Sequence, residues 1–340
     1  MKKVRFGFTV LVILAFSLIS CSSEGDIKQI LGKTAIAPVF LDCRPVSPTE
    51  IAFTFSRPVR VLSLNFDTQL ETKSIGEGEE VRISFTRPLE EGKKITADIL
   101  VEDADRNSLN VIVPFRARND RTPALVFNEI RTDYSNPRVE FVEFLALGPG
   151  NLGAMRLFIA HQSLDVPVYE FQPIEVKGGE YIVLHLRTVE EGCVDETGTD
   201  LTLSRGANAS DTARDLWVPG NRKIIHRTNG LWLLDQDDRI IDAILMSENP
   251  DTDAANKTFA AAAEFLGREN AWLPRSGPRP HDGWVPDPAS AVHTRGTTNT
   301  RTINRDESLP PERRAGNWYI AATGSASPGG PNSTRRHVVN

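Results

Sequence analysis

The segment at residues 224–245, IIHRTNGLWLLDQDDRIIDAIL, constrains the fold more than any other part of this chain. Two apolar runs, at residues 230–234 and 240–245, flank a polar turn at residues 235–238. This pattern predicts a β-hairpin. Because successive residues of both runs are apolar, rather than alternate ones, we expect the hairpin to be covered on both faces, in the middle of a β-sandwich.

Shorter strand patterns fill most of the remaining chain. Between residues 37 and 117 we find six or seven candidate strands separated by regular turns, which favours an antiparallel sandwich. Residues 118–123 contain no apolar residue and end in a proline, so they predict a domain boundary. A second set of strands follows up to residue 332, with one predicted helix at residues 256–270.

The first set of strands contains two sequence segments that resemble a known family. PVSPTEIAFTFSRPV (45–59) and LEEGKKITADILVEDADRNSLNVIVPF (89–115) resemble the bacterial Ig-like domains of surface proteins. Arg106 occupies a turn position at which that family usually has glycine. The resemblance implies an Ig-like spacer domain at residues 37–117.

The second set resembles the lamin-tail family, an Ig-like sandwich. The matching pieces, in the family order, are FNEI (127–130), VEFVEFLAL (139–147), GGEYIVL (178–184), NGLWLLDQDDRIIDAI (229–244), NWYIAA (317–322) and SPGGPN (327–332). The motif positions that we single out are Glu129, Glu143, Gly230, Asp242, Pro328, Gly329 and Asn332. The resemblance implies a lamin-tail-like domain at residues 123–332, followed by a frayed tail at 333–340.

Together these patterns predict an all-β protein with two Ig-like antiparallel β-sandwiches in tandem. An Ig sandwich needs about 100 residues, so the second domain carries long loop insertions, at residues 188–215 and 247–315, besides its one short helix. Because loops on a rigid scaffold commonly carry binding, we expect a function particular to this protein to lie there.

The N-terminus resembles a bacterial lipoprotein signal. Lys2, Lys3 and Arg5 precede an apolar stretch at residues 6–19, and Ser20-Cys21 follows. The resemblance implies that residues 1–20 are removed, that Cys21 is lipidated and that residues 21–36 form a tether to the membrane. The alternative is an ordinary secretory peptide with an incidental cysteine. Ser22 is not the aspartate that retains lipoproteins at the inner membrane, so we favour the outer membrane of the cell envelope.

Net charge and cysteine content limit the partners that we expect. The net charge is -6, and removal of residues 1–20, with three basic groups and no acidic one, brings it to -9. We therefore expect no nucleic-acid partner. The remaining cysteines, Cys43 and Cys193, either pair in an oxidising envelope or stay as buried thiols, and the sequence leaves both open.

Motifs of catalysis are scarce. The sequence has no HExxH, no GxSxG and no glycine-rich loop between a strand and a helix, and its six histidines lie far apart along the chain. His281-Asp282 with His293 are candidates for a small metal or base cluster, against the alternative of a solvated loop. Two acidic loops, Asp235 with Asp237 and Asp238, and Asp251 with Asp253, offer oxygen ligands for Ca²⁺, but turn formation and solvation account for them, and we expect no cofactor.

Two further sets of residues are candidates for a site. We expect Glu129 and Glu143 to pair with a buried arginine or to accept backbone hydrogen bonds, since a catalytic pair would need a cleft. The best candidates for an exposed recognition patch lie in the second insertion: Trp272, Arg275, Arg279, His281 and Trp284.

These observations favour a lipid-anchored protein of the cell envelope that acts as a non-enzymatic binding or scaffolding module for a protein or glycan partner. The alternative is a metal-assisted hydrolase, nuclease- or phosphatase-like, that uses the insertions, because lamin-tail domains in bacteria often accompany such enzymes. A third hypothesis is a structural role inside a larger envelope complex.

Overall fold

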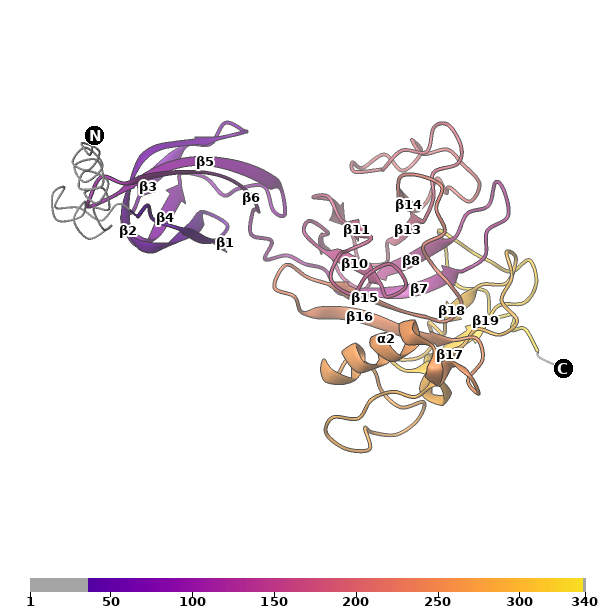
Figure 1. Cartoon of the computed structure of the whole chain (residues 1–340). Coiled ribbons are helices and arrows are strands. Elements are labelled where there is room, and N and C mark those ends of the chain that lie inside the picture. Colours follow the sequence, from indigo (N-terminus) through magenta and orange to yellow (C-terminus); the bar gives the residue numbers. More distant parts are fainter. Residues whose placement is uncertain (1–35, 339–340) are drawn as a thin grey trace, which may run out of the picture. The chain divides into compact units, whose positions relative to one another are not determined.

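A computed structural model describes residues 36–338 of the chain, so the predicted signal peptide, Cys21 and most of the predicted tether lie outside the described residues. The all-β class is confirmed, because strands dominate the described residues (Figure 1). The chain divides into two compact units, the first ending at Phe115 and the second running from Arg116 onward and including Leu89–Lys94. No helix of the described part is long and apolar enough to cross a membrane.

The first unit is one sheet of six strands in the order β3-β4-β2-β5-β6, with β1 also paired to β2. Its strands are β1 (Phe40–Ser47), β2 (Glu50–Phe66), β3 (Thr72–Ile75), β4 (Gly78–Phe85), β5 (Lys94–Asp103) and β6 (Ser108–Arg116).

Strand β2 replaces two shorter strands that the sequence pattern predicts, at residues 50–55 and 59–66. Its first half pairs with β1 and β4, and its second half pairs with β5. The register shifts between Thr54 and Val59, a stretch that contains Pro58, so an irregularity takes the place of the expected break.

In the turn between β5 and β6, Arg106 has a backbone conformation that favours glycine. Its φ of 64° is the left-handed conformation that glycine adopts without strain. Asp103 stabilises this turn, because its side chain accepts hydrogen bonds from the backbone N–H groups of Asp105 and Asn107, both at 2.9 Å.

The second unit contains two larger sheets and one small one. The first larger sheet has the order β11-β10-β15-β16-β17, the second has the order β14-β13-β8-β7-β18-β19, and β12 pairs with β9. The strands are β7 (Leu125–Arg131), β8 (Phe141–Ala146), β9 (Gly150–Asn151), β10 (Arg156–Ile159), β11 (Tyr169–Glu170), β12 (Glu175–Val176), β13 (Tyr181–His185), β14 (Arg214–Trp217), β15 (Asn229–Leu234), β16 (Ile240–Ser247), β17 (Val292–His293), β18 (Ile303–Arg305) and β19 (Trp318–Ile320).

The predicted hairpin is the β15-β16 pair, and the expected burial on both faces is confirmed. All six residues of β15 are buried, as are the last six residues of β16. The hairpin contributes to the hydrophobic core that both large sheets share. Helix α2 (Lys257–Arg268) packs against both of its strands, β15 and β16 (Figure 1). Gly230 permits this packing, because a Cβ there would lie 2.5 Å from the Cβ of Ala262.

Helix α2 begins and ends close to where the sequence pattern predicts. Asn256 is its N-cap, and the Asn256 side chain accepts hydrogen bonds from the backbone N–H groups of Thr258 and Phe259. Phe259, Ala262, Ala263 and Leu266 form the buried face, as their spacing predicts.

Residues 247–315 are less an appended loop than a part of the core. Besides α2, they supply β17, β18 and two 3₁₀ turns, η1 (Asp253–Ala255) and η2 (Pro288–Ser290), and a third turn, η3 (Ala315–Asn317), begins at their last residue. Among their buried residues are Trp272, Ala291 and Ile303. This segment therefore completes the sandwich rather than decorating it.

Candidate functional site

Antiparallel pairing brings several chain ends to one edge of the first large sheet of the second unit. β15 is antiparallel to both β10 and β16, so the end of β10, the start of β15 and the end of β16 must lie together. His161 follows β10, His226 and Arg227 precede β15, and Glu248 follows β16. The backbone N–H of His161 donates to the side-chain oxygen of Asn229, the first residue of β15, which fixes this junction.

These residues line a cavity of about 470 Å³, which we call the histidine pocket. Its lining consists of Asp133, His161, Lys223, His226, Arg227, Thr228, Glu248, Asn256 and Thr258. Every one of these side chains is polar, and the volume lies within the range of pockets that hold small molecules.

The two histidine rings of the pocket lie against each other in a tilted arrangement. Their ring centroids are 3.8 Å apart, with 49° between the ring planes. Burial, together with the neighbouring His161 and Lys223, lowers the pKa of His226 below its ordinary value. His226 therefore holds a proton less readily than an ordinary histidine does.

Arg227 bridges both carboxylates of the pocket. Its guanidinium donates to Asp133 at 2.7 and 3.1 Å and to Glu248 at 2.8 Å. The side chains are half-buried, so the arrangement is better shielded from solvent than an ordinary surface pair. The pocket wall is thereby held in one geometry before any ligand arrives.

The start of α2 is anchored to the same wall. The carboxylate of Asp253 accepts hydrogen bonds from the hydroxyls of Thr228 and Ser247, at 2.8 and 2.7 Å, and from the backbone N–H of Asn249 at 3.0 Å. Asp253 therefore ties the helix to β16 and to the segment before β15, and its oxygens are committed to this role.

The predicted recognition patch is not assembled as one exposed surface. Trp272 is fully buried, and its indole N–H donates to the carbonyl of Ser290 at 3.0 Å, so the expectation that it is exposed is wrong. The cause is the packing of Ala271 and Trp272 into the core, which the proline-rich sequence around them hides. Trp284 is half-buried, and His281 is exposed.

The two arginines of the predicted patch bind backbone carbonyls. Arg275 donates to the carbonyls of Ala289 and Ala291, and Arg279 donates to those of Trp272 and Gly267. Arg279 also lies over the ring of Trp284, 5.7 Å from its centroid. Both cations therefore hold the local backbone in place.

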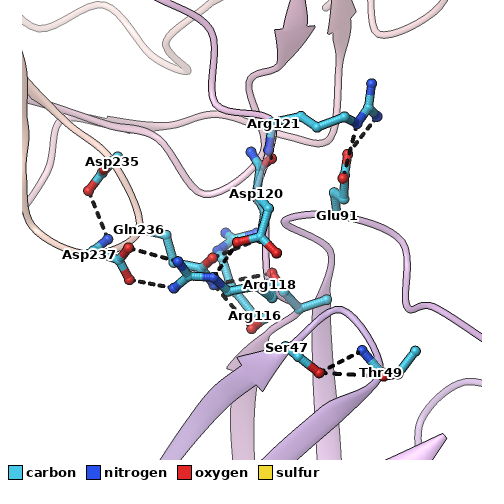
Figure 2. Close-up of polar contacts among 12 residues, drawn as sticks. Ser47, Thr49, Glu91, Arg116, Arg118, Asp120, Arg121, Asp235, Gln236 and Asp237 are labelled. Atoms are coloured by element: carbon cyan, nitrogen blue, oxygen red, sulfur yellow. Dashed lines mark hydrogen bonds and ion pairs between the residues drawn. The ribbon is translucent and has the colours of Figure 1, made fainter.

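The first acidic loop is the turn of the β15-β16 hairpin, and its carboxylates are occupied. Asp235 accepts hydrogen bonds from the backbone N–H groups of Asp237 and Arg239, which is turn formation. Asp237 receives two hydrogen bonds from Arg118, at 2.5 and 2.9 Å, as Figure 2 shows. Asp238 has a φ of 62° and pairs with Arg156.

No group of three or more His, Cys, Asp or Glu side chains within residues 36–338 is arranged to hold a metal ion. His281 and His293 accordingly do not join carboxylates in such a group. Asp251, in the second acidic loop, is exposed, whereas its neighbour Asp253 is buried in the role given above. Cys43 and Cys193 are both free thiols.

Glu129 and Glu143 are fully buried cross-strand partners on β7 and β8. Glu129 accepts hydrogen bonds from the backbone N–H and the hydroxyl of Ser327, and Glu143 accepts one from the backbone N–H of Gly329 at 2.6 Å. Both carboxyls therefore fasten the closing SPGGPN segment to the second large sheet, which is the backbone-capping role that we expected of them.

Other residues of the closing motif complete this attachment. The side-chain amide of Asn332 donates to the backbone carbonyls of Asn128 and Arg305, at 3.1 and 2.9 Å. Gly329 has a φ of 86°, and a Cβ there would lie 2.6 Å from the Cβ of Ser210. Pro328 is half-buried between these anchors.

The buried pair predicts a pH-dependent stability. Burial raises the pKa of Glu129, and burial together with the charge of Glu129 raises the pKa of Glu143 well above its usual range. The folded state thus holds this proton more tightly than the unfolded state, and the stability it contributes is present below the unfolded pKa of about 4.3 and is lost as the pH rises toward the folded pKa.

We expect Glu143→Gln, which is neutral at every pH, to gain stability relative to the natural protein as the pH is raised from 4.5 to 7.5, by up to about 1.4 kcal/mol per pH unit. Urea unfolding at three pH values would measure the difference. The exposed Glu264 on α2 provides the control, Glu264→Gln. Parallel pH profiles for the natural protein and Glu143→Gln would contradict the prediction.

Residues 123–320, which are 198 of the 340 residues, match the family TP_1001_2nd, described as a protein second domain. The chain belongs to this family. The TP_1001_2nd match contains every residue that lines the histidine pocket, from Asp133 to Thr258.

A curated relative has a similar sequence. An uncharacterized protein of Treponema pallidum (strain Nichols) is 26% identical over 207 residues, which cover 56% of this chain and 50% of that protein. The chain therefore spans about half the length of the curated relative that it matches.

Proposed function

We propose that this protein is a lipid-anchored, non-enzymatic binding module of the bacterial cell envelope, and that the histidine pocket receives its ligand. The single observation that carries the proposal is the pocket itself, an all-polar cavity of about 470 Å³ at one edge of a rigid sandwich. Loops at the end of a packed β-scaffold are a common place for binding sites.

The internal pairing of the pocket supports binding rather than a purely structural role. Arg227 and its two carboxylates form a preorganised wall, while Lys223 is exposed at the rim and the two histidine rings stand beside it. A site whose walls are already ordered loses little conformational entropy when it binds. The remaining polar groups suit a hydroxyl-rich or charged ligand, such as part of a glycan or of a protein partner.

The Ig-like, lamin-tail-like and lipoprotein resemblances belong to the same proposal. In this proposal the first unit acts as a spacer, the second unit is the binding domain, and Cys21 attaches the protein to the outer membrane. Cys21→Ala tests the anchor: the natural protein is expected to partition into the detergent phase and to incorporate labelled palmitate, and the variant is expected to do neither.

A comparison of two lysines tests the pocket. Lys223 lines the pocket, whereas Lys257, which is also exposed, lies at the start of α2 and outside the lining. Full-length natural protein, Lys223→Glu and Lys257→Glu would each be incubated with detergent-solubilised envelope from the parent cells, and the bound proteins and glycans would be quantified by mass spectrometry. We expect Lys223→Glu alone to lose a bound component, and equal recovery on all three would refute the pocket as the site.

A further inference from the structure

The charges of the histidine pocket are unequally committed. Both of its carboxylates, Asp133 and Glu248, already bind the guanidinium of Arg227. Asp133 also accepts a hydrogen bond from the hydroxyl of Thr132, at 2.9 Å. The acidic groups of the cavity are therefore satisfied within the protein and have little capacity left for a cationic ligand.

The basic groups of the pocket are not committed in this way. Across the described residues, no hydrogen bond or ion pair involves the Lys223 ammonium or the ring nitrogens of His161 and His226. Lys223 is exposed at the rim, and its charge acts on His226 strongly enough to lower the pKa of that ring. The uncommitted charge that faces the cavity is thus positive, and it increases when a histidine gains a proton.

The close contact of the two rings couples this charge to a ligand. Two imidazolium rings with centroids 3.8 Å apart would repel each other, and Lys223 adds to that repulsion. An anion between these groups offsets the repulsion, so binding of an anion favours the protonated histidine, and protonation favours binding by the same factor.

The charged groups on the elements packed around the two rings do not remove the effect of Lys223. Lys223 and Arg227 come from the segment before β15, Asp133 from the end of β7, and Glu248 from the end of β16. Glu140, just before β8, favours protonation of His226, but it is itself held by two hydrogen bonds from Arg187.

We propose that the histidine pocket binds a phosphate ester and that binding is linked to protonation of His226, whose ring lies against that of His161. A phosphate presents several oxygens to separate donors, which suits a lysine and two histidine rings better than a single carboxylate would. The cavity of about 470 Å³ has room for the esterified group as well as the phosphate. This inference rests on the proposed function and names the chemical class of its ligand.

Two sources supply such a group, a soluble phosphate ester and the head group of a phospholipid. The probes are therefore glycerol 3-phosphate, measured by titration calorimetry, and vesicles of phosphatidylglycerol with phosphatidylcholine vesicles as reference. The chain used is full-length Cys21→Ala, because an acyl anchor would insert into vesicles by itself. Inorganic sulfate is a third probe, because its charge stays constant between pH 5.5 and 7.5.

We expect sulfate to bind about tenfold more tightly at pH 5.5 than at pH 7.5, since one linked proton changes affinity by at most tenfold per pH unit. Glycerol 3-phosphate gains a proton itself in this range, so its gain in affinity is expected to be smaller. Lys223→Glu is expected to weaken binding at least about tenfold at both pH values. His226→Phe is expected to flatten the pH dependence, whereas His281→Phe, at an exposed histidine outside the pocket, is expected to match the natural sequence.

Binding of glycerol 3-phosphate without retention on phosphatidylglycerol vesicles identifies a soluble ester. Retention on phosphatidylglycerol vesicles that Lys223→Glu abolishes identifies a lipid head group. Both results support the proposal. Absence of binding to all probes, or binding that is independent of pH and of Lys223, overturns it. If that result accompanies loss of an envelope component from Lys223→Glu, the ligand class is wrong and the binding function stands. If Lys223→Glu also leaves envelope capture unchanged, both fail.

Discussion

Replacing Asp242 with asparagine is expected to lower the free energy of unfolding of the second unit by about 3–5 kcal/mol. Asp242 on β16 and Arg305 on β18 form an ion pair at 2.5 Å, and both side chains are almost completely buried. The same Asp242 oxygen accepts the backbone N–H of Phe127 on β7, and Arg305 donates to the carbonyl of Phe127. The pair thus joins the two large sheets, and its loss leaves a buried guanidinium without a counterion.

The β15-β16 hairpin offers a matched control for this substitution. Asp238 also pairs with an arginine, Arg156, but its side chain is 76% exposed. We expect Asp238→Asn to change stability by less than about 1 kcal/mol. All five tryptophans lie in the second unit, so unfolding in urea followed by tryptophan fluorescence reports on this unit.

A double replacement separates the ion pair from the packing. Asp242→Leu combined with Arg305→Met removes both charges and is expected to be less destabilising than Asp242→Asn alone, because the largest cost is an unpaired buried charge rather than the missing attraction. If Asp242→Asn lowered the free energy of unfolding no more than Asp238→Asn does, the Asp242–Arg305 pair would not be buried as described.

The second large effect is expected at Trp272. Trp272→Ala removes a fully buried indole and leaves the Ser290 carbonyl without its donor. We therefore expect the free energy of unfolding to fall by about 3–5 kcal/mol. Trp284→Ala, twelve residues later and half-buried, is expected to cost less than half as much. Urea unfolding of the two variants, monitored by fluorescence of the remaining tryptophans, gives the comparison.

The two tryptophans also discriminate between a core and a recognition role. If Trp272 belonged to an exposed recognition surface, its replacement would reduce capture of envelope components at unchanged stability. The structure predicts the opposite order of effects, with a loss of stability that comes first and any loss of binding following from it.

Local patterns predicted much of this architecture. The unbroken apolar runs on either side of residues 235–238 predicted the central hairpin, and the spacing of Phe259, Ala262 and Leu266 predicted helix α2. These features depend on the period of neighbouring side chains, which is a property of the sequence itself. The roles of Glu129 and Glu143 as acceptors of backbone N–H groups were also expected from their place within strands.

Long-range pairing hid the remaining features. Residues 247–315 read as an insertion because β17 and β18 are two and three residues long, too short to produce a strand pattern. Trp272 was placed on the surface because its neighbours are prolines and arginines, and only the fold shows that those arginines bind carbonyls.

The histidine pocket was missed for the same reason. His161 and His226 are 65 positions apart, and they meet only because β10 pairs with β15 in a particular register. One signal was nevertheless present, since His161 directly follows an apolar run at residues 157–160 and His226 lies four residues before the run at 230–234. Antiparallel pairing brings the end of one such strand next to the start of the other.

The pairing of β7 with β18 has a consequence for how the protein reaches its native state. Ile130 and Ile303 are register partners, so a central contact of the second unit waits for a strand made more than 170 residues later. Contacts between such distant positions slow folding and prolong the exposure of apolar strands. A nascent chain that has emerged only as far as β16 still lacks β18, Arg305 and the closing SPGGPN segment. During its biogenesis, the second unit therefore depends on protection from aggregation until nearly the whole polypeptide has been delivered.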